Sequence, residues 1–147
     1  MILSYFDSSV LLAILLDEKR QEEAFGYWQN SIRVSSILLR IETIICLRRT
    51  YENNSSKLEK DWLIKKTKIL DEYLYEVNYM VINNRIEREI HTKKDLAHCR
   101  SLDAIHIATA LRFREINNNE KMNFFSFDKI MIDLAKHYKF ETNDLTG

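Results

Sequence analysis

Short segments with strand character alternate with longer helical segments along almost the whole chain, and this alternation limits the possible folds most. Strands are expected at residues 3–6, 32–35, 79–82, 123–126 and 139–141. Helices are expected at residues 9–16, 18–30, 37–51, 57–77, 84–91, 101–114 and 129–137. Strands separated by helices favour a parallel sheet that is covered on both faces. The chain is therefore expected to be an α/β protein.

The composition is that of one ordinary globular domain. The chain has 147 residues, of which 46% are hydrophobic and 30% are charged, so a single domain is expected over residues 1–147. It contains no proline and only two glycines, and no segment has the composition of a linker. The 22 basic residues balance the 22 acidic ones, so a nucleic acid would have to be held by local patches or metal ions.

The cysteines and the apolar segments indicate where the protein works. Cys46 and Cys99 lack metal-ligand spacing and lie in apolar helical segments, as reduced thiols of an intracellular protein do. The apolar N-terminal segment contains Asp7 and lacks the basic region of a signal peptide. No run reaches the roughly 18 apolar residues of a membrane span. A soluble, cytoplasmic protein without a membrane partner is expected.

Two acidic residues directly follow expected strands. Asp7 comes after the first strand and Asp128 comes after the aromatic strand at 123–126. Each residue taken alone is most simply a helix N-cap. However, ligands of open parallel sheets bind beyond the carboxyl ends of the strands. The two carboxylates are therefore expected at the same edge of the sheet.

Glu42 lies on an apolar side of its expected helix. Its neighbours three and four positions away are Leu38, Leu39, Ile45 and Cys46. A carboxylate in such surroundings is costly unless it is paired or binds a cation. The sequence leaves three alternatives open: a position at the margin of the apolar stripe, pairing with Arg48 or Arg49, and binding of a cation.

Asp103 lies in the first turn of an expected apolar helix. Ser101 is the expected N-cap of this helix, which makes a capping role for Asp103 unnecessary. The segment AIHIATAL that follows is small and apolar enough to be buried, so Asp103 is expected to face a cleft or the interior. His106 could serve as a general base. The favoured interpretation is a packed histidine behind the acids.

Four carboxylates that converge without a cation would repel one another and raise each other's pKa. Mg²⁺ or Mn²⁺ removes this conflict, because these hard ions prefer oxygen ligands. Phosphodiester hydrolysis is the chemistry that most often uses such a site. The candidate catalytic and metal-binding residues are Asp7, Glu42, Asp103 and Asp128.

Four segments in this order resemble the PIN domain family, particularly the VapC ribonuclease toxins of toxin–antitoxin pairs: YFDSSVLL (5–12), VSSILLRIETIICLRR (34–49), SLDAIHIATAL (101–111) and FFSFDK (124–129). The resemblance implies a three-layer α/β/α sandwich with a central parallel sheet of about five strands. It also implies a Mg²⁺- or Mn²⁺-dependent endoribonuclease that hydrolyses an RNA substrate, is restrained by a cognate antitoxin and forms a homodimer.

The resemblance also assigns roles to individual positions. Asp7 and Asp103 would be direct metal ligands, whereas Glu42 and Asp128 would bind directly or through water. Hydroxyl side chains that the family often places beside the acids are matched by Ser8 and Ser126. Basic residues close to the acids in sequence are candidates for orienting an RNA phosphate: Arg48, Arg49 and Arg100.

The segment 57–77 has apolar residues at helical spacing and several lysines among them. An ordinary amphipathic helix with a solvated basic face accounts for most of this pattern. The functional interpretation is a groove that binds an antitoxin on one side and RNA phosphates on another. Because the segment 53–77 is long, the helical hairpin is expected to differ from that of the family, and the lack of loop glycines and prolines indicates loops of different length and shape.

Three other classes compete with a nuclease. A phosphatase of the haloacid-dehalogenase type needs an acid two residues after the first one, where this chain has Ser9. A receiver domain places its phosphorylated aspartate after a middle strand, which does not fit Asp7. A catalytically inactive PIN-like module that binds RNA or protein stays open.

Overall fold

Five parallel strands form the centre of the molecule in the computed structural model, which describes residues 1–145. The strands are β1 (Ile2–Phe6), β2 (Ser31–Ser36), β3 (Asn78–Met80), β4 (Asn123–Phe125) and β5 (Glu141–Thr142). Their order in the sheet is β3-β2-β1-β4-β5, and every neighbouring pair is parallel. The last two residues of the domain expected over 1–147 lie outside the described residues.

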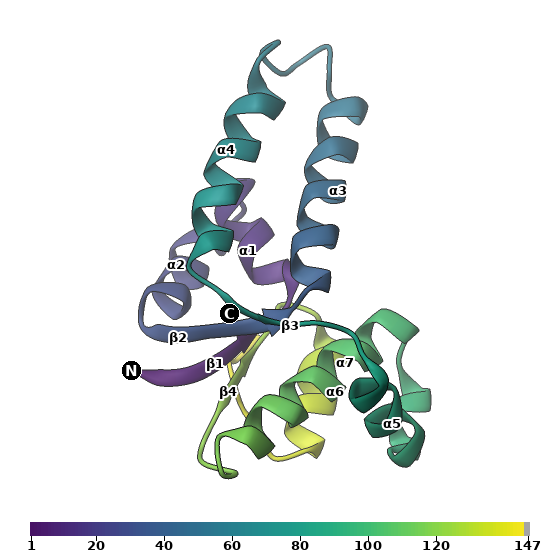
Figure 1. The fold of residues 1–147 in the computed structure, drawn as a ribbon. Coiled ribbons are helices and arrows are strands. Elements are labelled where there is room, and N and C mark those ends of the chain that lie inside the picture. Colours follow the sequence, from purple (N-terminus) through teal and green to yellow (C-terminus); the bar gives the residue numbers. More distant parts are fainter. Residues whose placement is uncertain (146–147) are drawn as a thin grey trace.

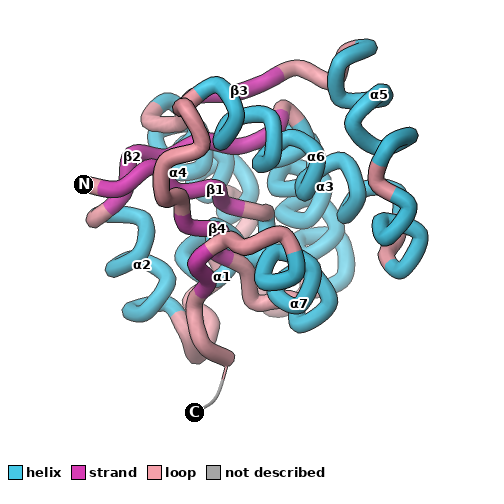
Figure 2. The backbone as a smooth tube through the Cα atoms, turned by 90° about the horizontal axis from the view of Figure 1, so that it is seen from below, coloured by secondary structure: helices cyan, strands magenta, loops and turns pink. Residues whose placement is uncertain are grey.

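Helices cover both faces of this sheet and give the expected three layers (Figures 1 and 2). Within residues 1–145 the helices are α1 (Ser8–Leu15), α2 (Gln21–Gln29), α3 (Leu38–Asn53), α4 (Trp62–Tyr75), α5 (Asn84–Thr92), α6 (Ser101–Ile116) and α7 (Lys129–His137), with a short 3₁₀ helix at Lys94–His98. In Figure 1, α3 and α4 form a hairpin that extends away from the sheet, whereas α5, α6 and α7 lie on the other side. The α/β/α sandwich that the sequence predicts is confirmed.

The alternation of side chains along β1 divides the core into two parts. Successive strand residues point to opposite faces of a sheet. Tyr5 packs into a cluster with residues of α6 and α7, and Phe6 packs into a second cluster with residues of α1, α2 and α4. Both rings are completely buried. Burying an aromatic side chain contributes about 1.5–3 kcal/mol, so β1 is held firmly from both sides.

Every expected strand and helix is present, but some boundaries differ. The helix expected from residue 57 begins only at Trp62. Residues 54–61 instead form turns, and Trp62 stacks on Tyr51 of the preceding helix, 6.2 Å between ring centroids. The expectation that Ser101 caps α6 is wrong, because Arg100 holds that position with an extended backbone and Ser101 is already helical. No helix within residues 1–145 is long and apolar enough to cross a membrane.

The strand order reverses direction at the centre of the sheet. From β1 the chain adds β2 and β3 on one side, and it later adds β4 and β5 on the other. In α/β proteins, ligands bind beyond the carboxyl ends of the two central strands at such a reversal. The Asp7 amide donates a hydrogen bond to the Phe125 carbonyl, 3.4 Å apart, so β1 and β4 end side by side. Asp7 and Asp128 therefore follow adjacent strands, as the sequence predicts.

Candidate active site

Asp7 is a buried carboxylate that also caps a helix. Its side chain is only 5% exposed. Oδ1 accepts a hydrogen bond from the Ser9 amide, 3.1 Å away, which caps the N-terminus of α1. Oδ2 accepts a hydrogen bond from the Ser126 hydroxyl at 2.6 Å. The capping interpretation is confirmed. Capping alone does not explain why Asp7 is buried, because a helix cap can also lie at the protein surface.

Two serine hydroxyls clamp Asp7 against the loop after β4. The Ser9 hydroxyl accepts from the Phe127 amide at 2.9 Å and donates to Asp7 Oδ1. The Ser126 hydroxyl accepts from the Asp128 amide at 3.0 Å and donates to Asp7 Oδ2. Because an ionised carboxylate only accepts hydrogen bonds, each hydroxyl gives its one proton to Asp7 and uses a lone pair to accept from the amide. The position of Asp7 is therefore coupled to residues more than a hundred positions away.

Glu42 of α3 is held by a histidine. Its Oε1 lies 2.6 Å from His106 Nε2, and His106 Nδ1 lies 2.6 Å from the Tyr5 hydroxyl. His106 is 2% exposed, so the interpretation as a packed histidine behind the acids is confirmed. The Tyr5 hydroxyl in turn accepts from the Ser36 amide at 3.1 Å. Glu42 is thus joined to β1, β2 and α6 through one chain of hydrogen bonds.

Asp103 and Asp128 lie at the starts of two helices. Asp103 occupies the first turn of α6 and forms an ion pair with Arg100, with 3.7 Å between Oδ2 and Nε. Asp128 caps α7 by accepting from the amides of Ile130 at 2.9 Å and Met131 at 3.4 Å. Both acids are partly buried. Asp128 follows β4, the strand beside β1, and it is close enough to Asp103 for the two charges to interact.

Electrostatic interactions connect the four acids in pairs. Burial raises the pKa of Asp7 above its ordinary value; hydrogen bonds from Ser126 and Ser9 lower this pKa again, and the charge of Glu42 adds to the increase. Burial also raises the pKa of Asp103, and the charge of Asp128 raises it further, against the opposing effect of Arg100. Each pair thus has the like-charge repulsion expected of a cation site.

The remaining candidates differ in their surroundings. Ser8 is partly buried as the first residue of α1. Arg48 and Arg49 are exposed on α3, and Glu42 pairs with His106 rather than with either arginine. The Arg100 side chain is 86% exposed beside Asp103. The pairing of Glu42 with an arginine, which the sequence left open, is therefore wrong.

The chemistry of the acids suits a divalent cation. Among residues 1–145, no three His, Cys, Asp or Glu side chains are arranged as a complete metal-binding group. The acids supply only oxygen atoms, which Mg²⁺ and Mn²⁺ prefer, and Mg²⁺ often binds through one or two carboxylates together with waters and substrate phosphates. The two pairs of repelling carboxylates, Asp7 with Glu42 and Asp103 with Asp128, fit that mode of binding. That all four carboxylates form one cluster remains a prediction.

Three residues that the sequence did not single out support the site. Ser9 donates to Asp7, Tyr5 is hydrogen-bonded to His106, and Asn143 holds the backbone of Ser126. The Asn143 Oδ1 accepts from the Ser126 amide at 3.0 Å, and its Nδ2 donates to the Ser126 carbonyl at 2.8 Å. Ser9 could have been identified from its position two residues after an N-cap aspartate. No sequence signal marks Asn143, because it follows the shortest strand.

Ser126→Ala is expected to lower the free energy of unfolding by about 1–3 kcal/mol, the cost of leaving buried polar groups unpaired. The substitution removes the donor to Asp7 Oδ2 and the acceptor of the Asp128 amide. Thermal unfolding should show a melting temperature lower by about 2–4 °C per kcal/mol. The control is Ser101→Ala, an exposed position that should change stability by less than about 0.5 kcal/mol. Equal melting temperatures for both variants would contradict the serine clamp.

The chain is similar to known proteins in sequence and in fold. The family model of the PIN domain matches residues 4–137. Among solved structures, a toxin–antitoxin complex from Klebsiella pneumoniae is similar, with a TM-score of 0.63 and 13% sequence identity over 97% of this chain and 98% of that chain. At this identity the similarity concerns the fold. A search of curated proteins found no match. Because the family match covers most of its length, the chain belongs to the PIN domain family.

Proposed function

We propose that this protein is a VapC-like toxin, an endoribonuclease that requires Mg²⁺ or Mn²⁺ and is restrained by a cognate antitoxin. The observation that carries the proposal is the buried carboxylate of Asp7 at the centre of the sheet. It is held by two serine donors and repelled by Glu42. Membership of the PIN family supports the proposal, since PIN domains are typically nucleases. The similar toxin–antitoxin complex supports the antitoxin partner.

The acids have distinct proposed roles. Asp7 and Asp103 bind the cation directly, and Glu42 and Asp128 bind it directly or through water. When bound, a divalent cation activates water for attack on the phosphodiester and stabilises charge on the leaving oxygen. Ser9 and Ser126 hold the Asp7 carboxylate in a fixed orientation. The cytoplasm, where cellular RNA is accessible, is the proposed location.

The exposed arginines are proposed to bind the RNA backbone. Arg100 lies beside Asp103 with most of its side chain exposed, and it can pair with a phosphate that approaches the acids. Arg48 and Arg49 lie on α3 beyond Glu42. Because the net charge of the chain is zero, such local contacts would have to supply the attraction to RNA. Binding is therefore expected to weaken as salt concentration rises.

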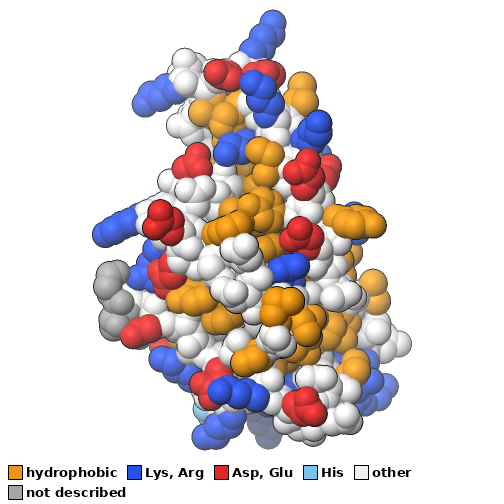
Figure 3. Space-filling model, turned by 90° about the vertical axis from the view of Figure 1, so that its left-hand side faces the viewer, with side chains coloured by type: hydrophobic (Ala, Val, Ile, Leu, Met, Phe, Trp, Pro, Cys, Tyr) orange, Lys and Arg blue, Asp and Glu red, His pale blue; other side chains and the backbone are white. Residues whose placement is uncertain are grey.

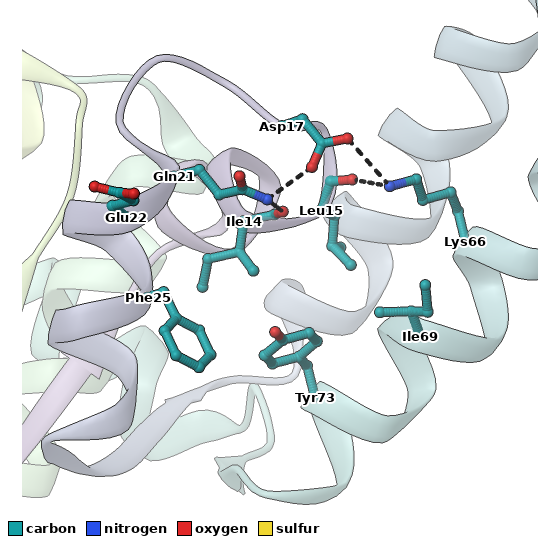
Figure 4. A pocket seen from close by; sticks show the side chains of 9 residues that line it. All are labelled: Ile14, Leu15, Asp17, Gln21, Glu22, Phe25, Lys66, Ile69 and Tyr73. Atoms are coloured by element: carbon teal, nitrogen blue, oxygen red, sulfur yellow. Dashed lines mark hydrogen bonds and ion pairs between the residues drawn. The ribbon is translucent and has the colours of Figure 1, made fainter.

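The antitoxin is proposed to bind along α2 and α4. Figure 3 shows a band of hydrophobic side chains on this face, with charged side chains on both sides. A pocket of about 430 Å³ lies between the end of α1, α2 and α4. In Figure 4, Phe25, Ile69 and Tyr73 surround its apolar part. A second pocket of about 460 Å³ shares these three residues and continues the groove toward Trp28.

One lysine of α4 builds this groove instead of facing solvent. Lys66 Nζ donates to the Leu15 carbonyl at 2.6 Å and lies 3.8 Å from an Asp17 carboxylate oxygen (Figure 4). Phe25 and Ile69 are 42% and 40% exposed beside it. An apolar segment of an antitoxin would cover both side chains, as amphipathic segments do in such grooves. The basic, solvated helix face expected from the sequence is therefore formed by the other lysines of α4.

A binding module without catalytic activity is the second candidate. It is favoured by one observation, the lack of a complete metal-binding group among residues 1–145. Such a module would keep the groove and the exposed arginines but would not cleave RNA.

A homodimer is a further proposal, which light scattering of the purified protein would test.

Incubating the antitoxin-free protein with a pool of structured and single-stranded RNAs tests the proposal. With Mn²⁺ or Mg²⁺ we expect cleavage at defined positions, mapped by sequencing the new RNA ends. Chelation of the metal by EDTA should abolish it. RNA binding without cleavage in the presence of either metal would instead support the binding module.

A further inference from the structure

We propose that His106 is a positioning residue that orients Glu42 for the metal-dependent reaction, with its ring held in the Nε2–H tautomer by Tyr5 and Ser36. This inference rests on the proposed function, because it takes Glu42 as a residue of the nuclease site. His106 itself touches neither RNA nor cation in this proposal. It acts through one hydrogen bond, from its Nε2 to Glu42 Oε1.

The hydrogen bonds at both ends of the ring are satisfied by one and the same neutral tautomer. A carboxylate only accepts hydrogen bonds, so the nitrogen 2.6 Å from Glu42 must carry the proton. In a neutral imidazole, Nδ1 is then an acceptor and needs a donor. The Tyr5 hydroxyl, 2.6 Å away, supplies that donor. Its own oxygen accepts from the Ser36 amide at 3.1 Å, which leaves the hydroxyl proton free for His106.

The surroundings prevent the ring from taking another orientation. Tyr5 and Ser36 are completely buried, and their strands are paired neighbours at the centre of the sheet. The Tyr5 ring stacks on Phe124, with 5.0 Å between centroids, and meets His106 edge-on at 5.7 Å. The nearby Ser35 hydroxyl donates to the Phe6 carbonyl at 2.6 Å.

Glu42 is the partly exposed end of this buried chain of hydrogen bonds. Glu42 keeps 24% of its side chain exposed, whereas His106 keeps 2%. The bond from His106 occupies Oε1 and restricts the rotation of the carboxylate, while Oε2 is the oxygen that we assign to the cation or its water. Groups that hold a metal ligand in this way change metal affinity or activity by about 10–100-fold when they are removed. In this proposal His106 therefore positions Glu42 in addition to packing in the core.

Two amide variants separate positioning from packing. The side-chain nitrogen of His106→Gln can reach the place of Nε2 and donate to Glu42, whereas His106→Asn is too short and can satisfy only Tyr5. We expect His106→Asn to lower both Mn²⁺ affinity, measured by calorimetry, and RNA cleavage by about 10–100-fold, and His106→Gln to stay within about threefold of the wild type. Equal losses in the two variants, or no loss in either, would overturn the proposal.

An NMR measurement tests the tautomer of His106 without requiring catalytic activity or a bound metal ion. In long-range ¹⁵N–¹H correlation spectra of the metal-free wild type, the His106 ring should show the Nε2–H pattern. The Nδ1–H pattern would overturn the assignment. Failure of the proposed function would be seen in the wild type itself, which would neither bind Mn²⁺ nor cleave RNA. Failure of the present inference would be seen in an active wild type whose Gln and Asn variants are equally impaired.

Discussion

Asp7→Asn is expected to reduce Mn²⁺-dependent RNA cleavage at least about 1,000-fold and to make the protein more stable at neutral pH. A cation ligand contributes several kcal/mol to such a reaction, and each 1.36 kcal/mol is about a tenfold change in rate. The loss of activity is therefore the largest effect expected of any single substitution. Cleavage rates under single-turnover conditions would measure it.

The gain in stability follows from the direction in which burial changes the pKa of Asp7. Its pKa in the folded protein lies above the ordinary value of 3.8, so the folded state binds the proton more tightly than the unfolded state. The contribution of Asp7 to stability is fully present below pH 3.8 and is lost as pH rises through the raised pKa. At neutral pH the buried charge destabilises the fold, and a tenfold difference in proton affinity between the two states corresponds to about 1.36 kcal/mol. Asparagine removes this charge and remains a good N-cap.

Thermal unfolding over a range of pH tests this second effect. We expect Asp7→Asn to melt above the wild type at pH 7 without metal, because the raised pKa of Asp7 makes its charge unfavourable in the folded state. The difference should disappear as pH falls below about 4, where both side chains are neutral. The control is Asp133→Asn, an exposed acid of α7 paired with Lys129, which should change neither cleavage nor melting. An Asp7→Asn protein that cleaves RNA normally would refute the proposed role of this residue.

Ile69→Asp is expected to weaken antitoxin binding by at least about 100-fold, as substitution of a central interface residue does. Ile69 lines both pockets of the groove beside Phe25, and a charge there would have to be buried under the partner. The probe is the polypeptide encoded next to this protein's gene, because antitoxins are normally encoded there. Its affinity would be measured by calorimetry with each variant.

Ile64→Asp is the matched control, since Ile64 lies on the same helix but is 75% exposed and lines neither pocket. It should change antitoxin affinity by less than about threefold, the effect of a surface substitution outside an interface. Both variants should cleave RNA at the wild-type rate, because α4 carries none of the proposed catalytic residues. Equal weakening by the two substitutions would contradict the proposed groove.

The fold could be predicted from local patterns because each strand and helix has its own apolar periodicity. The segments around Tyr5 and Phe124 are short and apolar, and a carboxylate follows each strand, Asp7 immediately and Asp128 three positions after the last residue of β4. Boundaries were harder to predict where tertiary contacts decide them. The start of α4 at Trp62 depends on stacking with Tyr51, and no local propensity shows such a contact.

The site could be predicted only as far as its acids. Asp7 and Asp128 were identifiable because parallel strands bring their carboxyl ends together. The partner of Glu42 was not, because His106 is 64 positions away and reaches it only through the packing of α6 on the sheet. The serine clamp on Asp7 likewise depends on the register of β1 with β4, which a single sequence does not show.

A calorimetric titration of Mn²⁺ tests most directly whether these acids form one cation site. The wild type would be compared with a double variant, Asp7→Asn with Asp103→Asn, in the absence of antitoxin. We expect specific binding by the wild type and none by the double variant, whose folding would be checked by its melting curve. Equal binding by both proteins, or no binding by either, would contradict a metal-dependent nuclease site and leave Asp7 as a buried helix cap in a binding module.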